Sequence, residues 1–402
     1  MRRRTVLFHC QHSLGLGHLV RSLALAGALA ERFRVVVLSG GRLPRGVGVP
    51  PGVELVALPP MGMTVDGELI SDDRRRSAER AMELRRAAIL AAHEALRPDV
   101  VLVELFPFGR RKFAPELLPL LEAAGHAGAL RLCSLRDLLV TSKPNQARHD
   151  ERAARLANEH FDAILVHSDP RFARLEESFR PATPLRVPVH YTGFVAPEER
   201  AAAPARARAA GQRPRVVVSA GGGRYGGDLL RAAAEAHGIG LSDAGIDVRI
   251  IAGPFLPEDE WHALRDAARG RPGLDVRRAV PDLRAEMQAA TASVSQCGYN
   301  TALDVLRTGV PALVVPFAAG REDEQTRRAQ RLEALGAVRV LPAARADGVT
   351  LAREVADLVR FRPAPVALDL KGARNTALFV ANTLARTAPP PAAPRPLVAV
   401  AG

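Results

Sequence analysis

Residues 295–311 read SQCGYNTALDVLRTGVP, in which an apolar strand ends, a glycine turns the chain and a helix begins. Asn300 or Thr301 is expected to cap the helix, because short polar side chains accept hydrogen bonds from its first free amides. Asp304 follows one turn later, on the helix face nearest the loop. Its carboxylate can either accept hydrogen bonds from two ribose hydroxyls or stand in solvent as an ordinary helix carboxylate. Gly309 ends the helix and leads into the next strand.

The same strand–loop–helix unit recurs along the chain. Short apolar runs rich in β-branched residues are predicted as strands at 5–10, 34–39, 99–104, 129–134, 163–167, 215–219, 247–252, 292–295, 311–315 and 337–341. Helices are predicted between them at 19–31, 75–96, 229–237, 258–268, 300–308 and 322–335. Continuous apolar strands separated by amphipathic helices indicate parallel sheets covered on both faces. We therefore predict an α/β fold of two doubly wound, Rossmann-like domains that face each other across a cleft.

Residues 196–214 interrupt this pattern, because they are rich in Ala, Arg and Pro and lack core periodicity. We interpret them as a linker between a first domain, 1–195, and a second domain, 215–365. Residues 366–387 contain one last helix, and the proline-containing tail 388–402 is predicted to be disordered. In open parallel sheets, ligands bind beyond the carboxyl ends of the strands. The chemistry is therefore expected in the loops that follow strands.

Composition narrows the class of protein. The chain has 402 residues, of which 47% are hydrophobic and 25% are charged, so it can bury two ordinary cores. Its formal net charge of +13 raises nucleic acid, anionic membranes and phosphorylated substrates as partners. Arginine is mixed with acidic residues and aromatic residues make up only 4%, which argues against nucleic acid. No apolar run approaches the roughly 20 residues of a membrane span, so a cytoplasmic protein is expected.

The first loop that could carry chemistry, residues 11–18, reads QHSLGLGH and opens a helix. Gly15 and Gly17 allow a tight turn, and the free amides of the helix start could hold a phosphate. His18 could take a proton from a hydroxyl nucleophile, or it could serve only as a local cap. His12 is a second candidate for the base.

The second loop, residues 219–226, reads SAGGGRYG and also joins a strand to a helix. Ser219 and the backbone amides of Gly221, Gly222 and Gly223 could hold a pyrophosphate, although the loop could also be a glycine-rich turn without a ligand. The following strand ends in Ala-Gly-Pro, without the acidic residue that binds the ribose in dinucleotide folds. This argues against an NAD-dependent oxidoreductase.

Three stretches together resemble the GT-B glycosyltransferases, most closely glycosyltransferase family 28, which includes the N-acetylglucosaminyltransferase of lipid II formation. They are residues 15–18, residues 219–223 and the long run 293–336. The run reads S-x-x-G-x-x-T-x-x-D/E, then G-x-P-A-L-x-V-P-F, then E/Q-Q and L-x-x-L-G-A. The lipid II-forming enzyme has glutamate where this chain has Asp304. The loop before Glu324 is also one residue longer here.

The resemblance implies a UDP-sugar donor in the second domain and a hydroxyl acceptor in the first, with inversion at the transferred sugar, for which N-acetylglucosamine is one candidate. His18 would face the acceptor hydroxyl as the catalytic base. Enzymes of this fold use helix dipoles and side chains to stabilise the leaving diphosphate, so no metal or other cofactor is expected. The last helix would return to the first domain. The donor-binding residues implied are Ser219, Gly221, Gly222, Gly223, Gly298, Asn300, Thr301, Asp304, Glu324 and Gln325.

Residues 104–112, ELFPFGRRK, look instead like a less-studied bacterial subgroup of predicted glycosyltransferases. In one interpretation this loop meets a phosphorylated or lipid-linked acceptor at a membrane surface. In the other, its two phenylalanines are buried and its basic residues form a solvated turn. The residues predicted for an acceptor or phosphate loop are Gly15, Gly17, Glu104, Arg110 and Arg111.

Two other functions remain open. A UDP-sugar 2-epimerase would share the fold but would need extra carboxylates in the cleft, for which Glu104 and Asp137 are the obvious candidates. A non-catalytic nucleotide-sugar-binding protein would keep the glycine loops without a base. For the transferase, the expected partners are a nucleotide-sugar donor and a small-molecule, glycan or lipid-linked acceptor, with peripheral contact at the inner membrane face and no nucleic acid.

Overall fold

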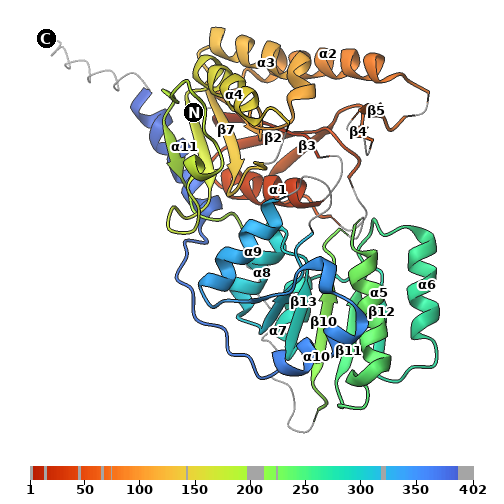
Figure 1. The fold of residues 1–402 in the computed structure, drawn as a ribbon. Helices are drawn as coiled ribbons and strands as arrows, with labels where there is room; N and C mark the ends of the chain where they lie inside the picture. Colours follow the sequence, from red (N-terminus) through yellow and green to blue (C-terminus); the bar gives the residue numbers. More distant parts are fainter. Residues whose placement is uncertain are drawn as a thin grey trace, which may run out of the picture.

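The protein consists of two parallel β-sheets, each covered by helices on both faces (Figure 1). The computed structural model describes residues 3–12, 16–43, 47–64, 68–73, 75–141, 144–196, 212–222, 225–317 and 323–387. The first sheet has the strand order β3-β2-β1-β6-β7-β8-β9, and the second has the order β12-β11-β10-β13-β14-β15. In each sheet the chain adds strands on one side of its first strand, β1 or β10, and then crosses back to add strands on the other side, as in doubly wound folds. The predicted α/β class with two Rossmann-like domains is confirmed.

The first domain contains an antiparallel pair in addition to its seven-stranded sheet. The sheet strands are β1 (Thr5–Cys10), β2 (Arg34–Ser39), β3 (Val53–Ala57), β6 (Val100–Glu104), β7 (Leu130–Arg136), β8 (Ala163–His167) and β9 (Val189–Tyr191), and the pair is β4 (Met61–Met63) with β5 (Leu69–Ser71). The helices are α1 (Leu16–Ala30), α2 (Ala78–Leu96), α3 (Ala114–His126) and α4 (Gln146–His160), with one-turn 3₁₀ helices at Arg111–Phe113 and Leu175–Glu177.

The second domain repeats the pattern around six shorter strands. These are β10 (Arg215–Ser219), β11 (Asp247–Ile251), β12 (Leu274–Arg277), β13 (Ala292–Ser295), β14 (Ala312–Val314) and β15 (Arg339–Val340). The helices are α5 (Gly227–Ala236), α6 (Glu258–Ala268), α7 (Leu283–Gln288), α8 (Tyr299–Thr308), α9 (Glu324–Ala334) and α10 (Gly348–Leu358), with a π-helical turn at His237–Leu241 and a 3₁₀ turn at Ala343–Arg345. No helix in the described part of the chain is long and apolar enough to cross a bilayer.

The central strand β1 shows why the sheet is covered on both faces. All six of its residues are buried, and successive side chains point to opposite faces. Leu7 packs in the core under α2 and α3, whereas Val6 and Phe8 pack in the core under α1 and α11 (Gly372–Thr387). A strand buried on both sides has to be apolar throughout, which is the pattern that predicted it.

The last helix, α11, lies against the first domain although it follows the second (Figure 1). Ala377 and Val380 of α11 share a core with α1. The chain enters the helix through a close contact, because a side chain on Gly372 would meet the carbonyl oxygen of Gly193 at 2.2 Å. Residues 197–211 of the predicted linker and the predicted tail 388–402 lie outside the described residues.

Candidate active site

The carboxyl ends of the central strands of both sheets lead into the interface between the domains. Loops after β1, β6 and β7 come from the first domain, and loops after β10, β13 and β14 come from the second. The Asn300 amide Nδ2 donates a hydrogen bond to the carbonyl oxygen of Gly17 at 3.4 Å, which joins the start of α8 to the start of α1. Gly15 and Gly223 were predicted for these loops and lie outside the described residues.

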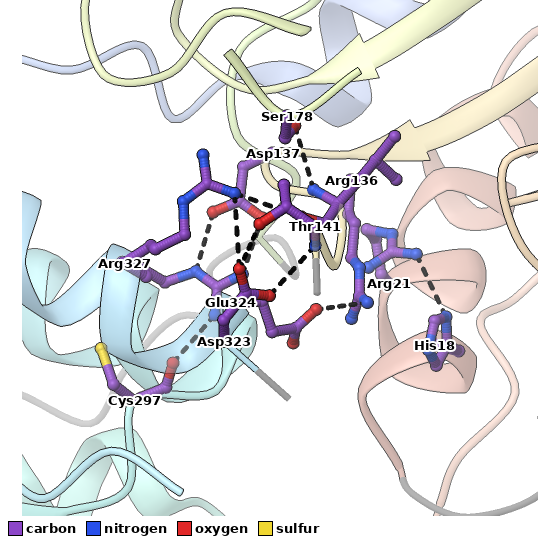
Figure 2. Close-up of polar contacts among 12 residues, drawn as sticks. His18, Arg21, Arg136, Asp137, Thr141, Ser178, Cys297, Asp323, Glu324 and Arg327 are labelled. Carbon is purple, nitrogen blue, oxygen red and sulfur yellow. Dashed lines mark hydrogen bonds and ion pairs between the residues drawn. The ribbon is translucent and has the colours of Figure 1, made fainter. Parts of the chain in front are cut away.

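His18 belongs to a buried group of charged side chains on the first-domain side. It lies in the first turn of α1, and its Nδ1 is 2.6 Å from Oε1 of Glu104, the last residue of β6. Arg21, one turn further along α1, forms an ion pair with the same carboxylate. Figure 2 shows Arg21 pointing toward His18. Burial opposes ionisation of Glu104, but the neighbouring His18 and Arg21 hold the pKa of that carboxyl well below its usual range.

The state of the His18 imidazole follows from these contacts. Burial lowers the pKa of His18 to about 4, although the Glu104 carboxylate acts in the opposite direction. The ring is therefore neutral at pH 7, with its proton on the Nδ1 that faces the carboxylate. The His18 side chain is 18% exposed whereas that of Glu104 is 0% exposed, so the histidine is the group that a substrate can reach. Nε2 of His18 is left with a free lone pair, as a general base requires.

Two other predicted residues, His12 and Glu104, are not positioned to act as the base. His12 is buried, and its Nε2 is hydrogen-bonded to the Ser39 hydroxyl at 2.9 Å, so it serves the end of the sheet. Glu104, predicted for the acceptor or phosphate loop, lies behind His18 and supports the imidazole.

The side chains of the predicted basic loop, residues 104–112, point in two different directions. Arg110 turns inward, and its charge acts on both Glu104 and His18. Arg111 instead contacts His149 on α4 and lines a separate groove. Phe106 and Phe108 are buried, as the second interpretation of this loop predicted, with Phe108 packed edge-on against Phe179 at 4.9 Å.

The glycine loop that follows β10 packs closely against the loop that follows β11. Ser219 is buried, and its hydroxyl has no hydrogen-bond partner within the described ranges. Gly221 has a left-handed φ of 58°, and the carbonyl of Gly222 accepts a hydrogen bond from the Phe255 amide at 2.9 Å. A side chain on Gly253 would meet the backbone of Gly222 at 2.6 Å, so the glycine after β11 is required for the two loops to pack.

Helix α8 begins at Tyr299 and points its amino-terminal end at the first domain. The cap is Gly298, which corrects the prediction that Asn300 or Thr301 would cap the helix. Because Gly298 offers no side-chain acceptor, the first amides of α8 stay available for an anion. Asp304 follows one turn later as predicted. Burial raises the pKa of Asp304 to about 7, so its carboxylate is poorly solvated in the free protein.

The start of α9 connects the second domain to the first. The Gln325 side-chain oxygen accepts hydrogen bonds from the amides of Cys297 at 3.0 Å and Phe317 at 3.1 Å, which ties together the loops after β13 and β14. Only its amide nitrogen can then serve a ligand. Glu324 forms an ion pair with Arg136 from the end of β7, as Figure 2 shows. The predicted donor-sugar residue therefore faces an arginine of the opposite domain.

Tyr299 and Arg328 form a joint between the domains that the sequence did not reveal. Arg328 makes two hydrogen bonds to the buried Asp137 carboxylate, at 2.7 and 2.8 Å. The Tyr299 hydroxyl accepts from the Val195 amide at 2.8 Å and donates to the carbonyl of His167 at 3.0 Å. The same ring lies under the guanidinium groups of Arg21 and Arg328, at 5.2 and 5.9 Å.

Known proteins resemble this chain in both sequence and fold. The glycosyltransferase family 28 C-terminal domain matches residues 259–381. A UDP-N-acetylglucosamine--N-acetylmuramyl-(pentapeptide) pyrophosphoryl-undecaprenol N-acetylglucosamine transferase from Burkholderia cenocepacia (strain HI2424) is 28% identical over 335 residues, which cover 80% of this chain and 79% of that protein.

Two solved structures share the architecture. The calicheamicin glycosyltransferase CalG4 superposes with a TM-score of 0.59 at 19% identity, covering 97% of this chain and all of its own. MurG from Acinetobacter baumannii superposes with a TM-score of 0.54 at 16% identity, covering 95% of this chain and 99% of its own. The GT-B architecture predicted from the sequence is confirmed, and the chain is a glycosyltransferase in which residues 259–381 match the C-terminal domain of family 28.

Proposed function

We propose that the protein transfers a sugar from a UDP-sugar to an acceptor hydroxyl, with inversion at the anomeric carbon and His18 as the base. The observation that carries this proposal is the neutral His18 imidazole. It is held by a buried carboxylate, and the start of α8, which has no side-chain cap, contacts the same turn of α1. An acceptor in the first domain and a donor phosphate at α8 would then meet beside Nε2 of His18.

The second domain supplies the groups that a nucleotide-sugar needs. Ser219 and the amides of Gly221 and Gly222 lie at the end of β10, where the diphosphate would bind together with the first amides of α8. Asp304 lies one turn along α8, where it would accept hydrogen bonds from the two ribose hydroxyls. The preference for UDP and for N-acetylglucosamine rests on the substrate for which the Burkholderia relative is named.

The transfer step follows from this arrangement. Nε2 of His18 takes the proton of the acceptor hydroxyl as its oxygen attacks the anomeric carbon. The bond from that carbon to the diphosphate breaks, and the diphosphate leaves with the electron pair on the opposite face. As His18 becomes positive, the Glu104 carboxylate stabilises the imidazolium at 2.6 Å. A single displacement of this kind inverts the configuration of the sugar.

We further propose that the reaction needs no bound metal. The leaving diphosphate would be stabilised by the start of α8 and by nearby guanidinium groups, which supply positive charge without one.

The epimerase alternative is disfavoured by the positions of its two candidate carboxylates. Glu104 is buried behind His18, and Asp137 is fully engaged by the two hydrogen bonds from Arg328. Neither carboxylate is therefore free to act on a sugar between the domains.

Calorimetry with UDP, TDP, GDP, UDP-N-acetylglucosamine, UDP-glucose and NAD tests the donor class directly. Micromolar binding of UDP or a UDP-sugar without a response to NAD is expected. Tighter binding of TDP or GDP would replace the proposed donor. If none of these nucleotides binds, the proposal is wrong, because the glycine loops would then be structural turns.

A further inference from the structure

Arg328 of α9 holds the loop that precedes α8. Its Nη1 donates a hydrogen bond to the carbonyl oxygen of Cys297 at 2.9 Å. The amide of Cys297 in turn donates to the side-chain oxygen of Gln325, in the first turn of α9, at 3.0 Å. Both backbone polar groups of Cys297 are therefore held by side chains of one helix. Because Gly298, the next residue, caps α8, these two contacts fix the place at which the first amides of α8 lie.

The same guanidinium group is held from the first domain. Asp137, the residue after β7, accepts hydrogen bonds from Nε of Arg328 at 2.7 Å and from Nη2 at 2.8 Å. The side chains are 0% and 1% exposed. Burial opposes ionisation of Asp137, but the charge and the hydrogen bonds of Arg328 hold the pKa of that carboxyl below its usual range. A buried, two-pronged ion pair of this kind fixes direction as well as distance.

The neighbours of Asp137 in sequence also contact the second domain. Arg136 forms an ion pair with Glu324 at the start of α9 (Figure 2). Leu138 is buried in a hydrophobic core that it shares with Tyr299 of α8. Three consecutive residues at the end of β7 therefore meet α8 and α9, and the Asp137 carboxylate is the one that reaches Arg328.

Strand β7 connects this contact to the proposed base. It pairs with β6, so that Ser134 lies beside Glu104, the carboxylate that holds His18. A direct contact between α8 and α1 also exists, from the Asn300 amide to the carbonyl of Gly17, but at 3.4 Å it is a long, single hydrogen bond. The buried ion pair is much the stronger of the two contacts, so we expect it to set the spacing between α8 and α1.

We propose that Arg328 is a positioning residue, which through Asp137 and Cys297 places the start of α8 relative to His18. This inference rests on the proposed transferase function, in which the donor diphosphate binds at α8 and the acceptor hydroxyl at His18. Attack on the anomeric carbon needs both groups in the right geometry, and a misplacement of about 1 Å can cost about 100-fold in rate. Arg328 would contribute to the rate without touching either substrate.

The double variant Asp137→Asn/Arg328→Gln tests this role, because it removes both charges and leaves neither one buried without a partner. The assay follows UDP release from saturating UDP-N-acetylglucosamine, with water as the acceptor, and the rate is expected to fall at least about tenfold. Calorimetry should give a UDP affinity within about threefold of the wild type, because Ser219 and Asp304 lie inside the second domain. A wild-type rate in the folded double variant would overturn the proposal, and so would a UDP affinity that falls as far as the rate.

Arg331→Gln is the matched control. Arg331 lies three residues further along α9, and its guanidinium also reaches the first domain, where it contacts the carbonyl of Phe172 and the carboxylate of Glu177. The rate and the UDP affinity should both stay unchanged in this variant. An equal fall in rate would overturn the proposal, because the whole interface would then be responsible. Arg328→Lys keeps the charge and loses the fork, so an intermediate rate is expected, and it replaces the double variant if thermal unfolding shows that the latter does not fold.

A proximity measurement tests the spacing without any nucleotide. A Cβ at Gly17 would lie 3.8 Å from Nδ2 of Asn300, so a short bifunctional thiol reagent should join the two positions in Gly17→Cys/Asn300→Cys. The fraction cross-linked in a fixed time is expected to fall at least about threefold when the double variant is added, and to stay unchanged when the control is added. An unchanged fraction with the double variant would overturn the proposal. If UDP fails to bind, the proposed donor falls while this result still decides what Arg328 positions. The native cysteines are buried: Cys10, Cys133 and Cys297.

Discussion

The two sides of the domain interface use different parts of the polypeptide. On the first-domain side, the groups that we propose to face the substrate are side chains: His18, supported by Glu104 and accompanied by arginines. On the second-domain side, they are mainly backbone amides at the end of β10 and the start of α8. Backbone amides bind a diphosphate whatever sugar it carries, whereas side chains can be matched to one acceptor and one proton transfer. Under the proposed function, the second domain would recognise the donor in a general way, and the first domain would carry out the chemistry on the acceptor.

The largest effect is expected for His18→Ala, which should change the transfer rate without changing the affinity for UDP. Transfer is expected to fall at least about 100-fold, while calorimetry gives a UDP affinity near that of the wild type, because the base acts only in the transfer step. The exposed His126 on α3 provides the control His126→Ala, which should leave both quantities unchanged. If UDP affinity collapses together with transfer, His18 belongs to the donor site and the division between the domains is wrong.

The Asp304→Ala variant tests the other side. UDP binding is expected to weaken about 10–100-fold, corresponding to about 1.4–2.8 kcal/mol for the loss of charge-assisted hydrogen bonds to the ribose. Asp282, near the start of α7, offers a control in Asp282→Ala. Its side chain caps α7 through the Ala285 amide at 3.1 Å, so this change should lower stability more than UDP affinity. An unchanged UDP affinity in Asp304→Ala would remove Asp304 from the site.

The same comparison explains what the sequence could predict. The bounds of β1, β2, β8 and β10 agree with the predicted ranges, because strands at the centre of a covered parallel sheet must be apolar throughout. Helix α4 was not predicted, since it buries mainly alanines, such as Ala153 and Ala157, among charged residues. Strand β3 was missed as well, because it lies at the sheet edge and is partly exposed.

The site shows the same division between local and distant information. The residues proposed for the donor side lie close together in the sequence, so glycine spacing and a nearby carboxylate are enough to identify a loop before a helix. The acceptor side is assembled from residues far apart in the sequence, since 86 positions separate His18 from Glu104. The contact between the domains joins more distant residues still, since 191 positions separate Asp137 from Arg328. Nothing in a local pattern links such residues. Arg136 and Tyr299 were therefore absent from the predicted site, although Tyr299 lies inside its most informative stretch.

The pH dependence of donor binding should sharpen the role of Asp304. Its pKa is raised to about 7 by burial, so the carboxylate loses its charge as the pH falls through 7. The affinity for UDP-N-acetylglucosamine is then expected to fall about tenfold between pH 8 and pH 6. This donor suits the measurement because its diphosphate has no group that titrates in this range.

Asp304→Asn is the control for that titration, and its affinity should be independent of pH over the same range. The sign of the stability effect is opposite. A carboxylate whose pKa is higher in the folded than in the unfolded protein destabilises the fold once the pH exceeds its unfolded value. Asp304→Asn should therefore raise the melting temperature of the free protein at pH 8 while weakening donor binding. A lower melting temperature would mean that the ionised carboxylate is satisfied in the free protein.

The smallest expected effect concerns metal ions and involves both sides of the domain interface. If the start of α8 and the arginines supply the positive charge for the leaving diphosphate, transfer should change less than about twofold after treatment with a chelator. The assay compares initial rates in chelator alone with rates after magnesium or manganese is restored. A rate that disappears and returns with the metal would show that the charge on the diphosphate is met by an ion. The backbone amides of the second domain would then bind the donor without being sufficient for its departure.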